Sequence, residues 1–262
     1  MDLGLKGKRA LISGASDGIG LAAAELLAEE GVDVALVARR ANVLKEGCDS
    51  IASKTGVKAV PLAADLSDKS VFDAVVNDAV DELGGLDILI NNAGASSFGG
   101  FGDITDEQWV ADINLKLFGF IRMTRAALPH LLKTGSGRIV NVAGNSGKQA
   151  LEYHMPGAAA NAAILNFSKS LSLQVGAQGV IINTVCPGPV RTARLVKQFA
   201  ANARDWNCTP EEAEERFLAG LPLPYIPSAR DIAYSIAFLA SPRAAYLNGT
   251  TITNDGGITR AV

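Results

Sequence analysis

The chain has 262 residues, of which 48% are hydrophobic and 19% charged, and its formal net charge is −3. This composition supports a large buried core, and α/β chains of this length commonly form one domain, so we expect a single domain over residues 1–262. Because nucleic acids and anionic membranes attract basic surfaces, the acidic balance argues against both as partners.

Cysteine use and the amino-terminal segment indicate where the protein works. Three cysteines, an odd count without CxxC spacing, predict neither a disulfide framework nor a metal site: Cys48, Cys186 and Cys208. The chain starts without the basic and apolar segments of a signal peptide. No apolar run approaches the ~18 residues that span a bilayer. We therefore expect free thiols and a cytoplasmic protein.

Short apolar runs alternate with longer segments of helical periodicity, which is the pattern of βαβ units. Seven strands are predicted near Arg9–Ser13, Asp33–Val37, Lys58–Pro61, Leu86–Asn91, Arg138–Val142, Ile181–Cys186 and Thr250–Thr253. Helices are predicted near Ile19–Glu30, Ala41–Lys54, Ser67–Leu83, Thr105–Leu132, Pro156–Val175 and Ala229–Leu239. This order predicts an α/β fold, a single-domain Rossmann-type doubly wound sheet of seven parallel strands with helices on both faces.

The segment from about 191 to 227 does not follow this alternation. It begins with basic residues, contains the acidic run Glu211-Glu212-Ala213-Glu214-Glu215, and has three prolines near its end. Long irregular segments in compact domains often cover an active site. We expect a mobile helical lid over the substrate, within the same domain.

A glycine-rich loop joins the first strand to the first helix. Gly14, Gly18 and Gly20 are spaced G-x-x-x-G-x-G. Such a loop lets backbone N–H groups and a helix N-terminus approach a pyrophosphate. Two more motifs follow later strands, namely Asn91-Asn92-Ala93-Gly94 and Pro187-Gly188-Pro189-Val190-Arg191-Thr192.

Together with Asn114 in a helix, these motifs resemble the short-chain dehydrogenase/reductase family over essentially the whole chain. The resemblance implies that Asp65-Leu66 contacts adenine and that Thr192 holds the nicotinamide carboxamide. It also implies a set of cofactor-binding residues that comprises Gly14, Ser16, Asp17, Gly18, Ile19, Gly20, Asp65, Leu66, Asn91, Ala93, Gly94, Asn161, Pro187, Gly188, Val190 and Thr192. Asn91 is also able to stabilise the central sheet.

The end of the second strand bears on the choice of cofactor. An acidic residue there would accept hydrogen bonds from the adenosine ribose, but this chain has Arg39 and Arg40 instead. A guanidinium suits a 2′-phosphate through charge-assisted hydrogen bonds, so NADP(H) is favoured over NAD(H). The alternative is that both arginines belong to a solvated turn, and Asp17 would repel a phosphate.

In relatives, catalysis uses an asparagine, a serine, a tyrosine and a lysine. The resemblance places these positions at Asn114, Gly144, Gly157 and Asn161, so only the asparagine is present. Positions i and i+4 share a helix face, which lets the lysine lower the pKa of the tyrosine that protonates the substrate oxygen. Asn161 is still able to hydrogen-bond a ribose, but it carries no charge.

Three nearby side chains are candidate replacements. Tyr153, four residues before the tyrosine position, is our first choice as proton donor. His154 titrates near neutrality, and Ser146 could donate to the developing oxyanion. Each has a structural alternative, as a packing residue, an exposed loop residue and a turn residue respectively. Lys148 is a weaker candidate for the missing ammonium.

Three functions remain open. The first is an NADP(H)-dependent oxidoreductase with an atypical proton donor; the second is an inactive nucleotide-binding sensor or oligomer partner; the third is a non-redox lyase or isomerase. The partner is then a small molecule, and basic residues near the lid favour an anionic one unless they are solvated: Arg191, Arg194, Lys197 and Arg204. The resemblance also implies a homodimer or homotetramer.

Overall fold

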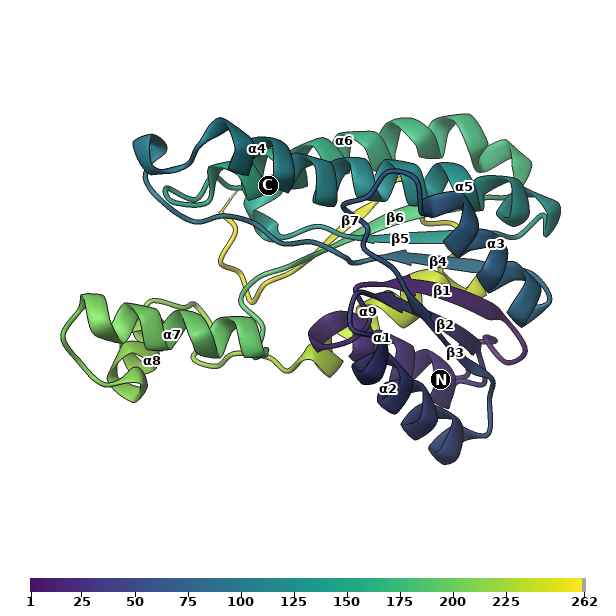
Figure 1. The fold of residues 1–262 in the computed structure, drawn as a ribbon, viewed down its shortest axis with the longest axis horizontal. Coiled ribbons are helices and arrows are strands. Elements are labelled where there is room, and N and C mark those ends of the chain that lie inside the picture. Colours follow the sequence, from purple (N-terminus) through teal and green to yellow (C-terminus); the bar gives the residue numbers. More distant parts are fainter. Residues whose placement is uncertain (261–262) are drawn as a thin grey trace.

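The protein is built on a seven-stranded parallel sheet, as the sequence predicts (Figure 1). The computed structural model describes residues 1–260, except for the side chains of residues 201, 202 and 205. The spatial order of the strands is β3-β2-β1-β4-β5-β6-β7. The strands are β1 (Arg9–Ser13), β2 (Asp33–Ala38), β3 (Ala59–Ala63), β4 (Ile88–Asn91), β5 (Arg138–Val142), β6 (Ile181–Pro187) and β7 (Thr251–Asn254).

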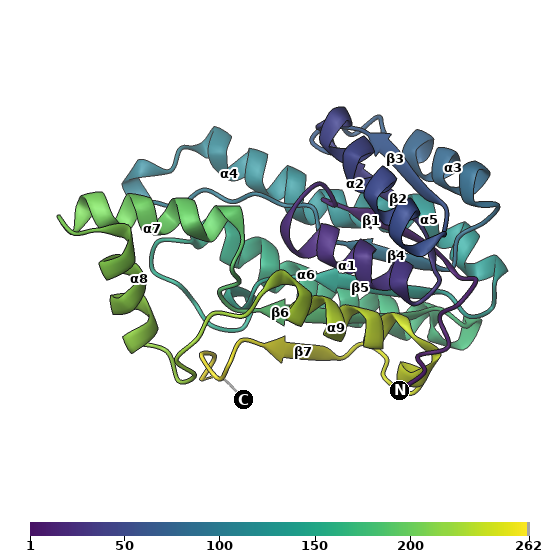
Figure 2. The ribbon, with the colours of Figure 1, turned by 90° about the horizontal axis from the view of Figure 1, so that it is seen from below.

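Helices cover both faces of this sheet and bury two separate apolar clusters (Figures 1 and 2). On one face lie α1 (Gly18–Glu29), α2 (Ala41–Thr55) and α9 (Ala229–Ala240). On the other face lie α3 (Phe72–Leu83), α5 (Gly119–Lys133) and α6 (Met155–Val175). Because both faces are covered, the central strands read as continuous apolar runs instead of alternating ones, and β1, β4 and β5 are almost completely buried.

Two helices differ from the predicted ones. The helix predicted from Ser67 begins at Phe72, because the carboxylates of Asp65 and Asp68 accept hydrogen bonds from Ser67 and Ser70 and hold that segment in turns. The helix predicted over Thr105–Leu132 is divided: α4 (Asp106–Ile113) and α5 are joined by a π-helical segment at Asn114–Phe118.

The predicted lid contains two helices that extend away from the sheet (Figure 1). These are α7 (Ala193–Asp205) and α8 (Pro210–Ala219). They pack on each other through a small apolar cluster that includes Phe199 and Phe217, whose ring centroids are 5.5 Å apart. This cluster is separate from the two cores of the sheet. Its role as a lid stays a prediction.

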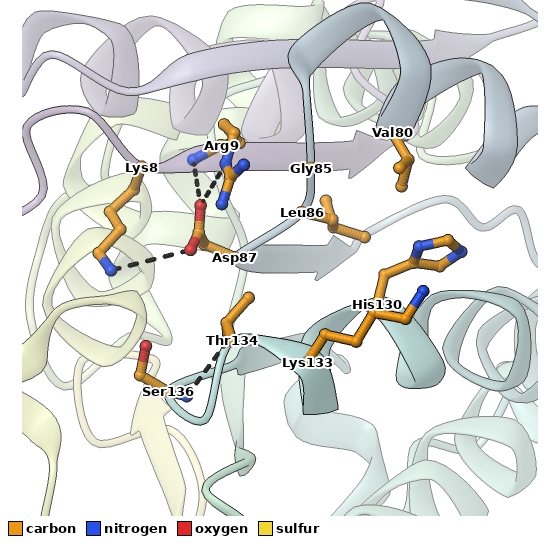
Figure 3. Close-up of a pocket in the computed structure, with 10 residues that line it drawn as sticks. All are labelled: Lys8, Arg9, Val80, Gly85, Leu86, Asp87, His130, Lys133, Thr134 and Ser136. Carbon is orange, nitrogen blue, oxygen red and sulfur yellow. Dashed lines mark hydrogen bonds and ion pairs between the residues drawn. The ribbon is translucent and has the colours of Figure 1, made fainter.

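The amino-terminal edge of the sheet carries a buried acid. Asp87 precedes β4 and is 5% exposed, and its carboxylate accepts hydrogen bonds from the backbone N–H and Nε of Arg9, at 3.1 and 2.7 Å. Lys8 lies 3.8 Å from the same carboxylate. These residues border an open pocket of about 450 Å³ with His130 and Lys133 of α5 on its other side (Figure 3). The ion pairs join β1 to β4.

Replacing Asp87 with alanine is expected to lower the unfolding free energy by about 2–3 kcal/mol, since it removes charged hydrogen bonds and leaves the Arg9 N–H without a partner. Urea denaturation measures this loss. Asp49→Ala is the matched control, because Asp49 is exposed and pairs only with Lys45 on the same helix, and it should leave the unfolding free energy nearly unchanged. Equal effects of the two substitutions would contradict a structural role for Asp87.

Candidate functional site

The carboxyl ends of β1 and β4 form a tight cradle at the opposite edge of the sheet. A β-carbon on Gly14 would lie 2.7 Å from Cα of Ala93, and one on Gly20 would overlap the carbonyl oxygen of Gly14. Asn92 Nδ2 donates to the carbonyl oxygens of Ser13 and Gly14, at 3.2 and 3.1 Å. Both glycines are therefore required for backbone to approach backbone here, and backbone is what a pyrophosphate binds at such a loop.

The amino terminus of α1 begins inside this cradle. Gly18 adopts a φ of +59°, and its N–H donates to the carboxylate of Asp17 at 2.6 Å. The methyl group of Thr192 lies 3.2 Å from the place a β-carbon on Gly18 would take. The structure thus brings the glycine loop together with the segment after β6, as the predicted cofactor set requires. Ile19 follows on the first turn of α1 and is partly buried against the apolar core.

Two guanidinium groups lie at the end of β2. Arg39 and Arg40 are both exposed, and Arg40 Nη2 is 3.5 Å from the hydroxyl of Ser16 in the glycine loop. The nearby carboxylate of Asp65 is held by Ser67, whose N–H and hydroxyl donate to it and keep its pKa low. Leu66 beside it is buried. Arg40 therefore faces the loop, and neither arginine forms an ion pair within the described residues.

Asn91 stabilises the centre of the sheet. Its Nδ2 donates to Thr124 Oγ1 at 3.0 Å and to Asn141 Oδ1 at 2.9 Å, and Asn141 in turn donates to Ser168 at 2.8 Å. This buried network ties β4 and β5 to α5 and α6. Ala93 and Gly94 continue from Asn91 along the cradle. These hydrogen bonds support a role for Asn91 in stabilising the central sheet.

Asn114 begins the π-helical segment between α4 and α5. Its Nδ2 donates to the carbonyl oxygen of Ser67 at 2.8 Å, and its Oδ1 accepts from Arg122 Nη1 at 2.8 Å. The side chain is therefore engaged with the loop before α3 and with α5. Both polar atoms of the Asn114 side chain therefore have protein partners. A role for Asn114 in catalysis stays a prediction.

Gly144, Ser146 and Asn161 come together where β5 meets α6. Asn161 is 1% exposed and its Nδ2 donates to Ser146 Oγ at 2.8 Å. The same nitrogen lies 3.0 Å from the place a β-carbon on Gly144 would take. Asn161 Oδ1 is buried and has no hydrogen-bond partner in the described residues, which is unusual for a strong acceptor. The structure therefore joins two of the predicted residues in one polar contact.

His154 fills the space in front of Gly157. A β-carbon on Gly157 would overlap both Nε2 of His154 and Oγ of Ser96. The imidazole stacks on Phe98, with ring centroids 4.3 Å apart and an interplanar angle of 12°. Its Nδ1 and the hydroxyl of Ser96 are buried and have no partner. A histidine ring thus lies where a side chain at position 157 would begin.

The electrostatic surroundings keep this imidazole neutral at neutral pH. Burial lowers the pKa of His154 to about 4, with further lowering by Lys116 and Arg194 and a smaller opposite effect from Asp112. A neutral imidazole has one N–H donor and one acceptor nitrogen. It can therefore donate a hydrogen bond to an oxygen or accept a proton from a hydroxyl.

Tyr153 lies outside this cluster. Its side chain is 58% exposed, and the adjacent carboxylate of Glu152 raises its pKa. Its carbonyl oxygen accepts from the N–H of Gly99 at 3.0 Å, which holds the two loops together. The exposed side chain is not a packing residue, and no hydrogen bond joins its hydroxyl to His154 within the described residues. A role for Tyr153 as proton donor stays a prediction.

Lys116 is a residue that the sequence analysis missed. It lies in the π-helical segment, and its Nζ is 3.4 Å from the place a β-carbon on Gly94 would take. Burial, together with the charge of Arg194, lowers its pKa to about 8. The only sequence signal was a lysine two residues after Asn114. The wider π turn changes which way residues 114–118 face, so a regular helical repeat would not have placed it.

The four basic residues near the predicted lid differ in their contacts. Arg191 forms an ion pair with Glu214 of α8, which commits it to the lid itself. Lys197 and Arg204 are exposed on α7. Arg194 differs, because its Nη2 reaches across to donate to the carbonyl oxygen of Gly94 at 2.9 Å. Among the contacts of these four residues that the structure describes, the one made by Arg194 lies at the cradle.

The end of β6 closes the remaining side. Gly188 donates its N–H to the carbonyl oxygen of Asn254, and a β-carbon there would lie 2.8 Å from Cβ of Asp255. Pro187 and Val190 are buried on either side of it. Cys186 is also buried, which raises the pKa of its thiol to about 12 and keeps it protonated. This thiol is therefore not poised as a nucleophile.

The residues fit a dinucleotide better than a metal. The glycine cradle offers backbone N–H groups, and buried acceptors and donors without partners lie further along the same edge. Within residues 1–260, no three His, Cys, Asp or Glu side chains gather as a metal site. No helix of this described part is long and apolar enough to cross a membrane.

The chain is similar to known reductases over its whole length. Residues 14–259 match the family described as enoyl-(acyl carrier protein) reductase. The 3-oxoacyl-(acyl-carrier-protein) reductase of Vibrio cholerae is 34% identical over 256 residues, covering 98% of this chain and 99% of the relative. D-beta-hydroxybutyrate dehydrogenase of Rhizobium meliloti is 33% identical, with 96% and 98% covered. The structure of L-sorbose reductase from Gluconobacter frateurii, complexed with NADPH and L-sorbose, has a TM-score of 0.96 at 32% identity and covers 100% of both chains.

The contact between position 157 and His154 can be tested by a double-mutant cycle. Gly157→Ala should destabilise the protein, because the added methyl group displaces both the stacked imidazole and the hydroxyl of Ser96, whereas the same change in a His154→Ala background should cost less, because only the overlap with Ser96 remains. We expect a coupling energy of at least about 1 kcal/mol from urea denaturation. Gly102→Ala is the control, since a β-carbon there meets no atom within 4 Å. Additive effects would contradict the contact.

Proposed function

Because the chain belongs to the short-chain dehydrogenase/reductase family, we propose that it is an NADP(H)-dependent oxidoreductase acting on a carbonyl or hydroxyl group of a small molecule. The observation that carries this proposal is the cradle formed by Gly14, Gly20 and Ala93, with Thr192 beside it. Such a cradle at the carboxyl edge of a parallel sheet is where a dinucleotide binds. The relatives described above are reductases and a dehydrogenase by name.

NADP(H) is the preferred cofactor in this proposal. Arg39 and Arg40 at the end of β2 supply positive charge where a 2′-phosphate would lie, and no acidic residue occupies that strand end. The L-sorbose reductase relative was crystallised with NADPH. When bound, the cofactor supplies the hydride. The chain's own contribution is to hold the pyrophosphate on the glycine loop and to offer Asn161 Oδ1 to a hydroxyl group.

We place the proton transfer on His154 ahead of Tyr153. Its Nε2 lies where the side chain at position 157 would project, and Ser96 Oγ lies beside it. In the reduction, the protonated imidazole gives its proton to the carbonyl oxygen as the hydride reaches the carbon, and in the reverse direction the neutral imidazole accepts the proton of the hydroxyl group. Ser146 stays a proposed second donor, held by Asn161 at 2.8 Å.

A second candidate function is a nucleotide-binding sensor, or the inactive partner in an oligomer. It is favoured by Gly144, Gly157 and Asn161, which provide neither a phenol nor an ammonium group at the positions that the family uses for proton transfer. A lyase or isomerase that uses the pocket without hydride transfer is a third. NADPH binding without oxidation across a panel of carbonyl compounds would favour the sensor, and product formed without cofactor would favour the third.

We also propose that the protein works in the cytoplasm as a homodimer or homotetramer. Large apolar side chains are exposed on the layer of helices that includes α4 and α6, namely Val110 and Leu173, at 67% and 72% exposure. Their burial between two copies would remove apolar surface from water.

Cofactor choice is tested by measuring NADPH and NADH affinity by fluorescence titration. Arg40→Ala and Arg39→Ala are each expected to weaken NADPH binding about tenfold, the loss of one charged hydrogen bond, while leaving NADH binding unchanged. Arg125→Ala, exposed on α5, is the control. A wild-type preference for NADH, or equal losses for both cofactors, would contradict the proposed role of the arginine pair.

The proton donor is tested by following NADPH oxidation with a carbonyl compound that the panel shows to be reduced. His154→Ala should lower kcat by about 10²–10⁴, the usual cost of losing a general acid, with NADPH affinity unchanged. Added imidazole should restore part of the loss. Tyr153→Phe should leave kcat nearly unchanged. The reverse pattern, with Tyr153→Phe inactive and His154→Ala active, would assign the proton to Tyr153.

A further inference from the structure

Two cationic side chains from distant parts of the chain meet at Gly94. Lys116 reaches it from the π-helical segment, with Nζ 3.4 Å from the place of a β-carbon on that glycine. Arg194 reaches it from the lid and donates to its carbonyl oxygen at 2.9 Å. The residues are separated by 78 positions in the sequence, so the meeting is a product of the fold.

This cation pair lacks a matching acid. Neither Lys116 nor Arg194 forms an ion pair with any residue in the described part of the chain. The acid that faces this cluster is Asp112 of α4, and its carboxylate accepts the N–H of Ser97 at 2.6 Å. Lys116 is partly buried, so its charge is costly unless an anion approaches. The local balance is two positive charges against one negative charge.

Unpartnered polar atoms gather at the carboxyl edge of the sheet, on the loops after β4 and β5 and on α6. Ser96 Oγ, His154 Nδ1 and Asn161 Oδ1 are all buried without a hydrogen-bond partner, as are four other side-chain atoms elsewhere in the described part of the chain. Buried polar groups are almost always paired, so these three atoms need a partner, and a polar group of a ligand is one that the charges beside them favour. Gly157 belongs to the same arrangement, because only glycine leaves room there for the imidazole and the serine hydroxyl.

We propose that Lys116 and Arg194 together bind an oxyanion group of the substrate, a carboxylate or a phosphate ester, and hold its reacting oxygen beside His154. The substrates are then oxo-acids or phosphorylated carbonyl compounds and the corresponding alcohols. The part of this proposal that concerns the carbonyl rests on the proposed oxidoreductase function. The binding of the anion does not depend on it.

Anion binding at this pair has a consequence for His154. The charged groups that face the imidazole are Lys116 of the π-helical segment, Arg194 of α7 and Asp112 of α4. A bound anion offsets the two cations that disfavour the imidazolium, so the pKa of His154 rises from about 4 when the ligand is bound. The substrate itself then helps to load the proton that the reaction needs.

The binding experiment uses two matched pairs of probes, pyruvate with pyruvamide and dihydroxyacetone phosphate with dihydroxyacetone. Calorimetric titration of the full chain, with and without saturating NADP⁺, should show at least one anion binding about tenfold more tightly than its neutral partner. Lys116→Met and Arg194→Met should each weaken that anion about tenfold and leave the neutral compound unchanged. Lys197→Met, exposed on the same helix as Arg194, should match the wild type.

Two controls keep the outcome decisive. The first is Lys116→Arg, which keeps the positive charge and should therefore retain anion binding, whereas Lys116→Met should not. The second is circular dichroism, which checks that each variant is folded. Anion binding equal in wild type and both methionine variants overturns the proposal. A second outcome also overturns it: Arg194→Met loses NADPH affinity, and saturating NADP⁺ abolishes anion binding to the wild type. The two cations would then bind the phosphates of the cofactor.

Proton uptake separates this proposal from the proposed function. Titrations at pH 6 in buffers of different ionisation enthalpy should show that the wild type takes up a fraction of a proton with the anion, and that His154→Gln does not. This readout needs no turnover, so a protein that binds the anion and takes up the proton but reduces nothing would reject the oxidoreductase and leave the anion site in place. Equal proton uptake in both proteins would overturn the link to His154.

Discussion

The parallel register of β1, β4, β5 and β6 is the constraint on which the candidate site depends. Because all four strands run the same way, their carboxyl ends deliver four loops to one edge of the sheet. The loops approach so closely that Gly14 and Gly20 have no room for a side chain. The opposite edge is held by Asp87 and Arg9, so the strands cannot slide without breaking a partly buried ion pair.

Within that frame, the amino terminus of α6 is arranged around a missing side chain. Gly157 lets the imidazole of His154 lie against the helix, stacked on Phe98 and next to Ser96. A larger residue would push the ring away from Ser96. The absence of a side chain at Gly157 therefore leaves space that is already filled by the imidazole, the group to which we assign the proton transfer.

The sequence predicted the seven strands and the parallel sheet well, since buried parallel strands separated by amphipathic helices leave a strong pattern. It predicted the glycine loop from its spacing, from its place between a strand and a helix and from the Asn91-Asn92-Ala93-Gly94 motif, and it identified Ser146, His154 and Asn161 as neighbours of interest. It ranked Tyr153 ahead of His154 as proton donor, because the direction of two adjacent loop residues depends on the stacking of His154 on Phe98, which the sequence does not show. It missed Lys116, because a π turn interrupts the helix in which that residue was expected to lie.

The position of the cations bears on how such a site works. A lysine beside a phenol lowers the pKa of an acid that becomes an anion, so the charge helps the proton leave. A lysine beside an imidazole opposes the proton instead, because the protonated ring is a cation. Lys116 and Arg194 therefore make His154 a poor acid until negative charge arrives between them. A substrate anion supplies that charge, which links recognition of the substrate to the protonation state of the residue beside it.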